Sequence, residues 1–423
     1  MTQPSLRLIP MHAAIAAGRS VTLDVLVKIE PPPLDLPKQR PPLNLGFVLD
    51  RSGSMHGQKI KYAGDAIAYA VGQLLPSDRL SLTVFNNRVK TKIPSTLATD
   101  KQQIYDLLTH MKVGGSTALH AGWVNGGIQV SEYLDSEHLN HVILLSDGLA
   151  NVGETNPDQI ANDVHGLCQQ GVTTSVLGVG ADYDEDLLDS MARSGDGNFF
   201  HIDAPEQLPD IFETELQGLI GTVAHSVTLA ATPMAGTVLS QVLNDLERTD
   251  TGALKLPNLR LRDPLQVVLR LRIPSLEVGT NVLNVDLNWQ TLDQSEPQQL
   301  QTTLYLDVVS PEQLSDFPAD PVVQEQVALL MAARARQEAI AFADQGDWDS
   351  AIFVLRDSTS TLGRMGTNSD MIVNELATLT DLTTGFESGE RRRARKQAMA
   401  QKYHLSRSRA SSYGQKRDRQ SES

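Results

Sequence analysis

The sequence predicts an α/β domain with a doubly wound, mostly parallel six-stranded sheet, inserted into an antiparallel β-sandwich and followed by an α-helical region. Three observations support this fold class. Between about residues 43 and 222, continuous apolar runs alternate with segments of helical periodicity, which is typical of strands covered on both faces. The segments on either side alternate apolar and polar residues with period two. From Asp320 onward the pattern is helical.

The α/β pattern begins with Leu43–Leu49, a continuous apolar run, and Lys59–Leu75 follows with apolar residues at helical spacing. Two short strands around the turn dipeptide Asn86-Asn87 predict a hairpin. Further along, Asn156 and Pro157 have the residue types of a helix N-cap and first helical position. The other expected elements are strands at 80–85, 89–93, 141–145, 172–179 and 198–202, and helices at 100–111, 117–134, 156–170, 184–193 and 205–220.

The flanking segments predict strands with one buried face and one solvent-exposed face. Val21–Ile29 is such a strand, and the segments 267–273, 283–289 and 304–308 repeat its alternation. A single strand near residue 25 is not stable alone, so we expect both flanks to fold together into one sandwich. The proline-rich segment 31–42 would then be a stiff, extended connector into the α/β domain.

The helical region is expected to contain about three helices, with a break at 346–348. The Ser- and Arg-rich end of the chain lacks aliphatic residues and is expected to be disordered. The predicted organisation is N-terminal strands of the sandwich at 1–38, the α/β domain at 39–222, the rest of the sandwich at 223–312, the helical domain at 320–403 and a disordered basic tail at 404–423.

Composition narrows the classes of function. The formal net charge of −15 argues against nucleic acid as a partner. The single cysteine, Cys168, excludes an internal disulfide and a cysteine-based zinc site, and we expect it to be a small buried side chain. The N-terminal residues lack a signal-like apolar run, and no stretch is long and apolar enough to span a membrane. A cytoplasmic protein is the resulting expectation.

The most informative residues follow the first strand of the α/β domain. Asp50 lies at its carboxyl end, and Ser52 and Ser54 follow on a loop loosened by Gly53. In a doubly wound sheet, ligands bind beyond the carboxyl ends of the strands. Thr117, after Gly114-Gly115, and Asp147, after the strand at 141–145, are expected at the same edge.

Together these five residues supply three hydroxyls and two carboxylates, without histidine or cysteine. Such hard oxygen ligands suit Mg²⁺, and Mn²⁺ or Ca²⁺ would fit less specifically. Hydroxyls carry no formal charge, so an ion bound mainly by Ser52, Ser54 and Thr117 stays electrophilic. It would attract an external carboxylate into an open coordination position.

The motif D-x-S-x-S after a first strand, the glycine-rich turn with Thr117 and the later Ser146-Asp147-Gly148 closely resemble the von Willebrand factor type A domain. The resemblance covers about residues 43–222, and the flanking sandwich and helices are similar to bacterial and plant members. It implies a metal-ion-dependent adhesion site, in which Ser52, Ser54 and Thr117 ligate the metal. Asp50 and Asp147 would then act mostly through water and hydrogen bonds.

The expected function is a scaffold or adaptor that binds a partner protein through a metal-bridged Asp or Glu, with no catalytic residues. One alternative is a regulatory subunit of a chelatase-like or other ATPase, since such machines recruit type A domains. Another is a metal-dependent hydrolase with Asp50 as phosphoryl acceptor, although the usual second Asp is replaced by Ser52.

Overall fold

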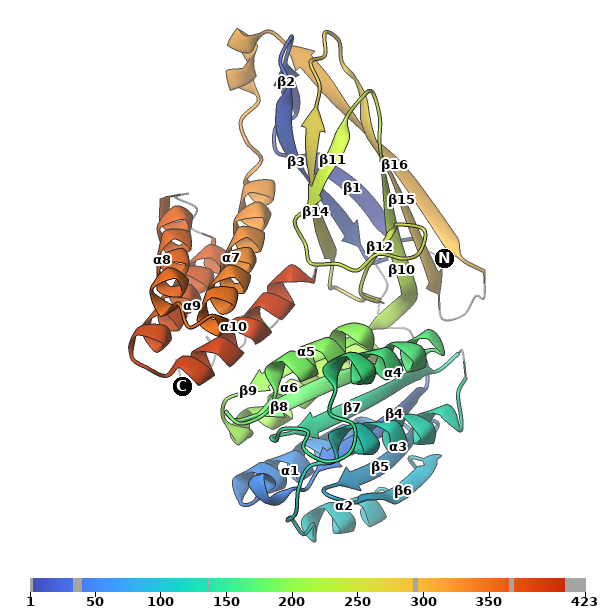
Figure 1. The fold of residues 1–423 in the computed structure, drawn as a ribbon. Coiled ribbons are helices and arrows are strands. Elements are labelled where there is room, and N and C mark those ends of the chain that lie inside the picture. Colours follow the sequence, from blue (N-terminus) through green and yellow to red (C-terminus); the bar gives the residue numbers. More distant parts are fainter. Residues whose placement is uncertain (1–2, 33–39, 136, 292–295, 365–368, 408–423) are drawn as a thin grey trace. The chain divides into compact units, whose positions relative to one another are not determined.

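The computed structural model describes residues 3–32, 40–135, 137–291, 296–364 and 369–407 (Figure 1). The chain forms two compact units, one of residues 37–221 and one of residues 1–36 together with 222–423. The α/β segment is therefore inserted between two segments that fold together, which confirms the predicted architecture. Residues 33–39 of the predicted connector lie outside the described residues.

The sheet of the α/β unit has six strands in the order β6-β5-β4-β7-β8-β9. All neighbours are parallel except β5 and β6, which form the predicted antiparallel hairpin. Every residue of β4 and β7 is buried, as their apolar runs predict. The strands are β4 (Leu43–Asp50), β5 (Arg79–Phe85), β6 (Val89–Leu97), β7 (Leu139–Ser146), β8 (Val172–Val179) and β9 (Asp196–Ile202).

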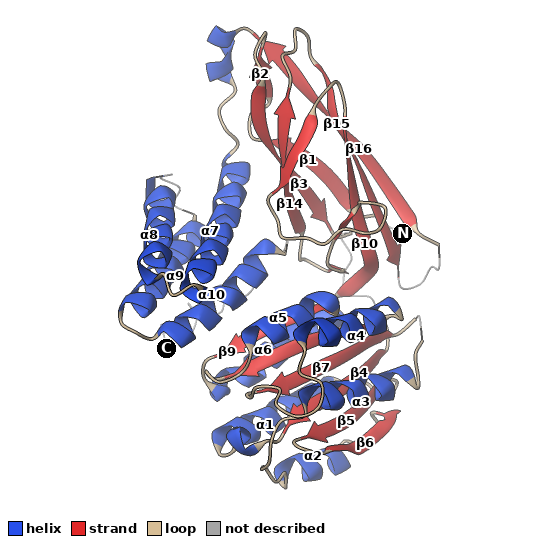
Figure 2. Ribbon diagram, viewed as in Figure 1, coloured by secondary structure: helices blue, strands red, loops and turns tan. Residues whose placement is uncertain are grey.

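Helices cover both faces of this sheet (Figures 1 and 2). Successive residues of β4 show this, because Gly46 faces Val130 of α3 whereas the ring of Phe47 stacks on that of Phe212 in α6 at 6.4 Å. The helices are α1 (Gln58–Gln73), α2 (Gln102–Thr109), α3 (Leu119–Ser131), α4 (Pro157–Gln169), α5 (Glu185–Ser194) and α6 (Leu208–Ile220), with short 3₁₀ turns at Gly53–Met55 and Pro205–Gln207. The sheet thus presents the carboxyl ends of β4 and β7 side by side.

The sandwich of the other unit consists of two sheets. One has the order β1-β3-β14-β11, and the other has the order β12-β10-β15-β16-β2, with β13 also paired to β10. Their strands are β1 (Ser5–Pro10), β2 (Ala14–Ala16), β3 (Val21–Glu30), β10 (Thr222–Pro233), β11 (Val238–Val242), β12 (Leu254–Lys255), β13 (Leu259–Arg260), β14 (Leu265–Ile273), β15 (Thr280–Thr291) and β16 (Gln298–Val309). The strands at β3, β14, β15 and β16 match the predicted ones, whereas β1, β2 and β10–β13 were not predicted.

One sheet of the sandwich is apolar on both faces, contrary to the prediction of one wet face. Val27 of β3 belongs to the core between the two sheets. On the opposite face of that sheet, Leu26 and Val268 form a second cluster with Val323 and Leu330 of the first C-terminal helix. This second cluster joins the helical region to the sandwich.

The helical region has four helices among the described residues, α7 (Pro321–Asp344), α8 (Trp348–Arg364), α9 (Asp370–Glu387) and α10 (Arg391–Ser406), preceded by a 3₁₀ turn at Pro311–Asp316. The Asp320 side chain caps α7 by accepting from the backbone N–H groups of Val322 and Val323. A break at Ser388 and Gly389 separates α10 from α9, because Gly389 adopts a positive φ of 89°.

The predicted tail boundary at residue 404 is wrong. Residues 404–406 belong to α10, and Ser406 is buried. Its carbonyl oxygen accepts a hydrogen bond of 3.1 Å from the backbone N–H of Asp245, which fixes this end of the helix. Residues 408–423 of the predicted tail lie outside the described residues. Among the described helices, none is both long and apolar enough to cross a membrane.

Candidate functional site

Three loops meet at the carboxyl edge of the α/β sheet. The first follows β4 and carries Ser52 and Ser54, the second precedes α3 and carries Thr117, and the third follows β7 and carries Asp147. Backbone hydrogen bonds join the first two loops, because Gly53 N–H donates to the Gly115 carbonyl at 3.0 Å and Gly114 N–H donates to the Arg51 carbonyl at 2.9 Å.

Asp50 anchors the loop after β4. Its carboxylate is completely buried and accepts hydrogen bonds from Ser52 N–H at 2.7 Å and from Ser146 Oγ at 2.6 Å. Burial raises the pKa of Asp50 from 3.8 to about 6, while these hydrogen bonds act in the opposite direction and the charge of Asp147 adds to the rise. A nearby cation would stabilise the charged form of this carboxylate.

A chain of hydrogen bonds links three more of the predicted residues. Ser52 Oγ lies 3.1 Å from Ser54 Oγ, and Ser54 Oγ donates to Asp147 Oδ1 at 2.7 Å. Ser52 and Asp147 are buried, whereas Ser54 is exposed. The site therefore has a buried floor and one hydroxyl that is open to solvent.

Thr117 reaches the same place from the second loop. It precedes α3, which starts at Leu119, so it lies in the loop and not in the helix predicted from residue 117. Asn151 holds it there, because Thr117 N–H donates to Asn151 Oδ1 at 2.8 Å and Asn151 N–H donates to the Thr117 carbonyl at 3.1 Å. A Cβ atom on Gly148 would lie 3.0 Å from Thr117 Oγ1 and 3.7 Å from Ser54 Oγ. Thr117 thus lies beside the loop of Asp147 and near Ser54, which hydrogen bonds link to Ser52 and, through the Ser52 backbone, to Asp50.

Asn86, at the end of β5, orders the second loop. Its Nδ2 donates to the Gly114 carbonyl at 2.5 Å, and its own carbonyl accepts from Ala118 N–H at 2.8 Å. Gly115 has a φ of +89°, and a Cβ atom there would lie 2.9 Å from Asn87 Oδ1. Neither Asn86 nor Asn151 was predicted as a site residue, because each acts from another loop.

The donor set fits a hard divalent cation. It contains only oxygen atoms from hydroxyls and carboxylates, and two of the carboxylate oxygens, Asp50 Oδ1 and Oδ2, are already held by hydrogen bonds within the loops. Among the described residues, no group of three or more His, Cys, Asp or Glu side chains is arranged to hold a metal ion. A site that uses Ser52, Ser54 and Thr117 for direct contacts would differ from such carboxylate or imidazole clusters.

Lys59, in the first turn of α1, also belongs to the site and was not predicted there. Its Nζ lies 2.5 Å from Asp147 Oδ2, so the two oxygens of this buried carboxylate contact Ser54 and Lys59. Gly180, just after β8, lies beside this side chain, and a Cβ atom at Gly180 would be 3.4 Å from Lys59 Nζ. The site thus contains a cationic side chain as well as two carboxylates.

Other predicted features lie at the rim or elsewhere. His56 is exposed and its Nδ1 lies 3.0 Å from the Gly53 carbonyl, which agrees with a rim position. His120 pairs with Asp163 of α4 at 2.9 Å. Cys168 is in the last turn of α4 and is partly exposed, so the expectation that it is buried is wrong.

A buried Ser–Glu–His arrangement bears on the hydrolase alternative. Ser175 Oγ donates to Glu215 Oε1 at 2.5 Å, and His141 Nε2 lies 3.3 Å from the same oxygen. All three side chains are buried, and the carboxylate lies between the serine and the histidine. In a serine nucleophile the histidine must contact the hydroxyl directly, so this cluster has the wrong order for acyl transfer.

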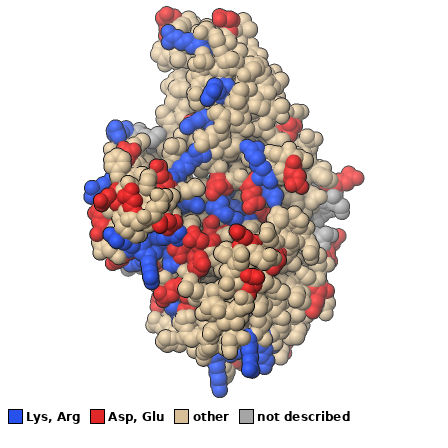
Figure 3. Space-filling view, viewed as in Figure 1, with Lys and Arg blue, Asp and Glu red and all other residues tan. Residues whose placement is uncertain are grey.

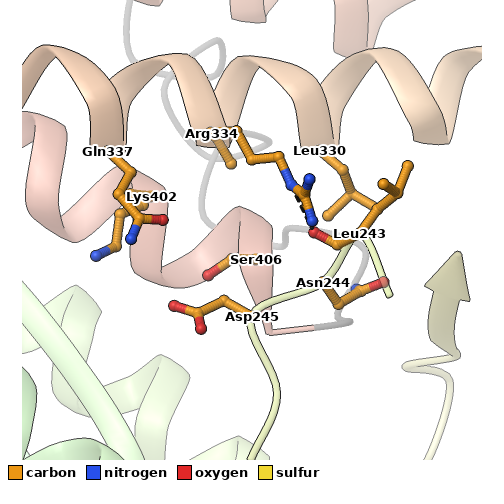
Figure 4. Close-up of a pocket in the computed structure, with 9 residues that line it drawn as sticks. Leu243, Asn244, Asp245, Leu330, Arg334, Gln337, Lys402 and Ser406 are labelled. Carbon is orange, nitrogen blue, oxygen red and sulfur yellow. Dashed lines mark hydrogen bonds between the residues drawn. The ribbon is translucent and has the colours of Figure 1, made fainter. Parts of the chain in front are cut away.

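The second unit has a hollow of about 260 Å³ between the loop after β11 and helices α7 and α10 (Figure 4). Arg334 spans it by donating to the Val242 carbonyl at 2.8 Å and to the Leu243 carbonyl at 3.2 Å. Asp245 and Lys402 bring charges of both signs to its lining. These contacts join helix to sheet, and we assign this hollow a structural role.

Comparisons with known proteins agree on the α/β unit. Residues 44–214 match the family model of the von Willebrand factor type A domain. The Synechocystis protein sll0103 is 26% identical over 344 residues, covering 76% of this chain and 79% of that protein. The inter-alpha-trypsin inhibitor heavy chain H1 of Mesocricetus auratus is 30% identical over 194 residues, covering 43% of this chain but 21% of that protein.

Solved structures are similar over nearly the whole chain. The von Willebrand factor type A protein from Catenulispora acidiphila has a TM-score of 0.69 at 16% identity and covers 96% of this chain and 97% of its own. The ArnB paralog VWA2 from Sulfolobus acidocaldarius has a TM-score of 0.64 at 19% identity, covering 95% of this chain and 98% of its own. At these identities the likeness shows a shared fold of sandwich, α/β domain and helices.

Proposed function

Residues 44–214 form a von Willebrand factor type A domain, a module that typically mediates protein–protein interaction, and on this premise we propose that the chain is a metal-dependent binding protein. A divalent cation, Mg²⁺ above all, would be held by Ser52, Ser54 and Thr117, with Asp50 and Asp147 behind them. An Asp or Glu of a partner protein would complete its coordination.

The observation that supports this proposal best is the convergence of three loops on one small oxygen-rich space. Ser54 Oγ is hydrogen-bonded to Asp147, Ser52 Oγ lies beside Ser54 Oγ, and Thr117 Oγ1 faces Gly148. Hydrogen bonds from Ser146 and from the Ser52 backbone already hold Asp50, so its charge acts at the floor of the site. A cation there would remain under-neutralised and open to an external anion.

Exposure supports binding at this edge. Ser54 and Gly53 are exposed, and Leu149, two residues after Asp147, is 54% exposed. These residues are open to solvent and would be available for contact with a partner at this edge. On the face drawn in Figure 3, Lys and Arg side chains and Asp and Glu side chains are interspersed.

Titration calorimetry with Mg²⁺ and Mn²⁺ tests the site. The variant Thr117→Val removes one hydroxyl at nearly constant shape, and Thr99→Val, at an exposed position outside the site, is its matched control. We expect Thr117→Val and Asp50→Ala to weaken metal binding by about tenfold or more. Equal affinity in wild type, Thr117→Val and Asp50→Ala would rule out this site.

The partner is tested by affinity capture from cell extract with Mg²⁺ or with EDTA. Proteins that bind the wild-type chain only with metal, and that do not bind Thr117→Val, are the expected partners. Substituting acidic residues on a captured partner should then abolish binding, because one of them completes the coordination. Capture that is the same in EDTA would contradict a metal-bridged mode.

A further inference from the structure

We infer that Lys59 is a built-in counter-cation that weakens metal binding until a partner carboxylate arrives. This inference rests on the proposed function and assigns a role to a side chain that the function does not need. Its basis is the contact of Lys59 Nζ with Asp147 Oδ2 at 2.5 Å, on a carboxylate that is completely buried.

The first step of the argument concerns the metal-free protein. A buried carboxylate is costly unless it is paired or hydrogen-bonded. Ser54 contacts Asp147 Oδ1 and Lys59 contacts Asp147 Oδ2, so both oxygens of the carboxylate have a partner and the side chain is oriented without a metal. Lys59 is itself three-quarters covered, with 24% of its side chain exposed, so solvent screens the pair only partly.

The second step concerns the space that Lys59 occupies. Its side chain passes beside Gly180 after β8, where an added Cβ atom would lie 3.4 Å from Nζ and 3.5 Å from Cε. These are ordinary van der Waals distances, and Gly180 is a glycine because its φ of +79° is one that other residues rarely adopt. The lysine therefore runs from the first turn of α1 past the loop after β8 to Asp147.

The third step is the charge of the site. Two carboxylates would give a charge of about −2, and the ammonium reduces it to about −1 when both carboxylates are ionised. A divalent cation near Asp147 would then lie close to a like charge, which disfavours its binding at the few-ångström distances of the site. A partner carboxylate adds the missing negative charge, so metal and partner would each strengthen the binding of the other.

Metal titration of the full chain tests this inference, with Lys59→Met removing the charge and Lys59→Arg retaining it. Lys61→Met, two residues along α1 at an exposed position, is the matched control. We expect Lys59→Met to bind Mn²⁺ about tenfold more tightly than wild type, whereas Lys59→Arg and Lys61→Met should bind like wild type. Thermal unfolding in EDTA should show Lys59→Met less stable than Lys61→Met, because Asp147 loses its partner.

The outcomes separate this inference from the proposed function. If Thr117→Val loses metal binding while Lys59→Met binds metal like wild type or more weakly, the counter-cation role is wrong and the metal site stands. If Lys59→Met binds metal measurably and the wild-type chain does not, the counter-cation role of Lys59 is supported. If neither wild type nor Lys59→Met binds metal, both the site and the role of Lys59 are refuted.

Discussion

Substitution of Asp50 by asparagine tests the electrostatics of the site in the metal-free protein. Asp50 is completely buried, and burial raises its pKa from 3.8 to about 6. An acid whose pKa is higher in the folded state binds protons more tightly there, so the fold loses stability as the pH rises between 3.8 and about 6. Above that pH range the folded protein carries the whole free-energy cost of burying the charged Asp50 carboxylate. The substitution Asp50→Asn removes this cost.

The magnitude follows from the shift and from the hydrogen bonds. About two pKa units correspond to roughly 3 kcal/mol. This shift already includes the hydrogen bonds from Ser52 and Ser146, which act to lower the pKa of Asp50, and asparagine retains an acceptor for Ser52 N–H. We expect Asp50→Asn to raise the free energy of unfolding by up to about 3 kcal/mol near pH 8 in EDTA, with little gain near pH 4.

Hydrogen exchange on peptides from β4 and β7 measures this quantity for the α/β unit alone. Asp65→Asn, at an exposed position of α1, controls for the loss of one negative charge. Adding Mg²⁺ should reverse the ranking, because wild type gains stability from the bound ion and Asp50→Asn gains little. A variant that is less stable than wild type near pH 8, or a difference that does not change with pH, would refute the reasoning.

Three further substitutions are informative. Gly148→Ala places a Cβ atom 3.0 Å from Thr117 Oγ1, and calorimetry should show metal binding weakened by about tenfold. Asn151→Ala removes the acceptor for Thr117 N–H, and metal binding should weaken although no proposed ligand has changed. Arg336→Met leaves the buried Glu375 without its ion-pair partner and should lower the free energy of unfolding of the sandwich-and-helix unit by about 3–5 kcal/mol in urea.

Controls for these variants come from the same elements. Gly166→Ala lies in α4 where an added Cβ meets nothing within 4 Å, so metal binding should not change there. Replacing both Arg336 and Glu375 by apolar residues should recover much of the stability lost in the single variant, because no uncompensated charge remains. An Arg336→Met protein as stable as wild type would show that the pair contributes nothing, and unaltered metal binding in Asn151→Ala would exclude its positioning role.

The sequence predicted the parts of the site that depend on strand ends. Asp50 and Asp147 follow buried apolar runs, and parallel strands bring their carboxyl ends to one edge, so their proximity follows from topology. Ser52 and Ser54 follow from local spacing. Three site residues were not predicted, namely Lys59, Asn86 and Asn151. Each contacts a residue of another loop that is distant in sequence, and sequence periodicity does not show such contacts.

In the fold, too, features with a local sequence pattern were predicted and features that depend on contacts distant in sequence were not. Long apolar runs and clear alternation predicted the α/β sheet and strands β3, β14, β15 and β16. Strands β1 and β2 are short. The backbone hydrogen bonds of β1 are made with β3, and the local sequence pattern does not show this pairing. The break before α10 did carry a signal, since Ser388-Gly389 precedes the arginine-rich segment, and the end of α10 is held by Asp245 from the sandwich.

The pairing of β3 with β14 has a consequence for how the chain is made. Val27 of β3 lies opposite Val267 of β14, and the whole α/β domain is synthesised between them. The first thirty or so residues therefore leave the ribosome without their main sheet neighbour, while the α/β domain has all of its own strands in one continuous segment. The α/β domain can therefore fold before the sandwich is complete, whereas β3 can pair with β14 only after residues 265–273 have emerged.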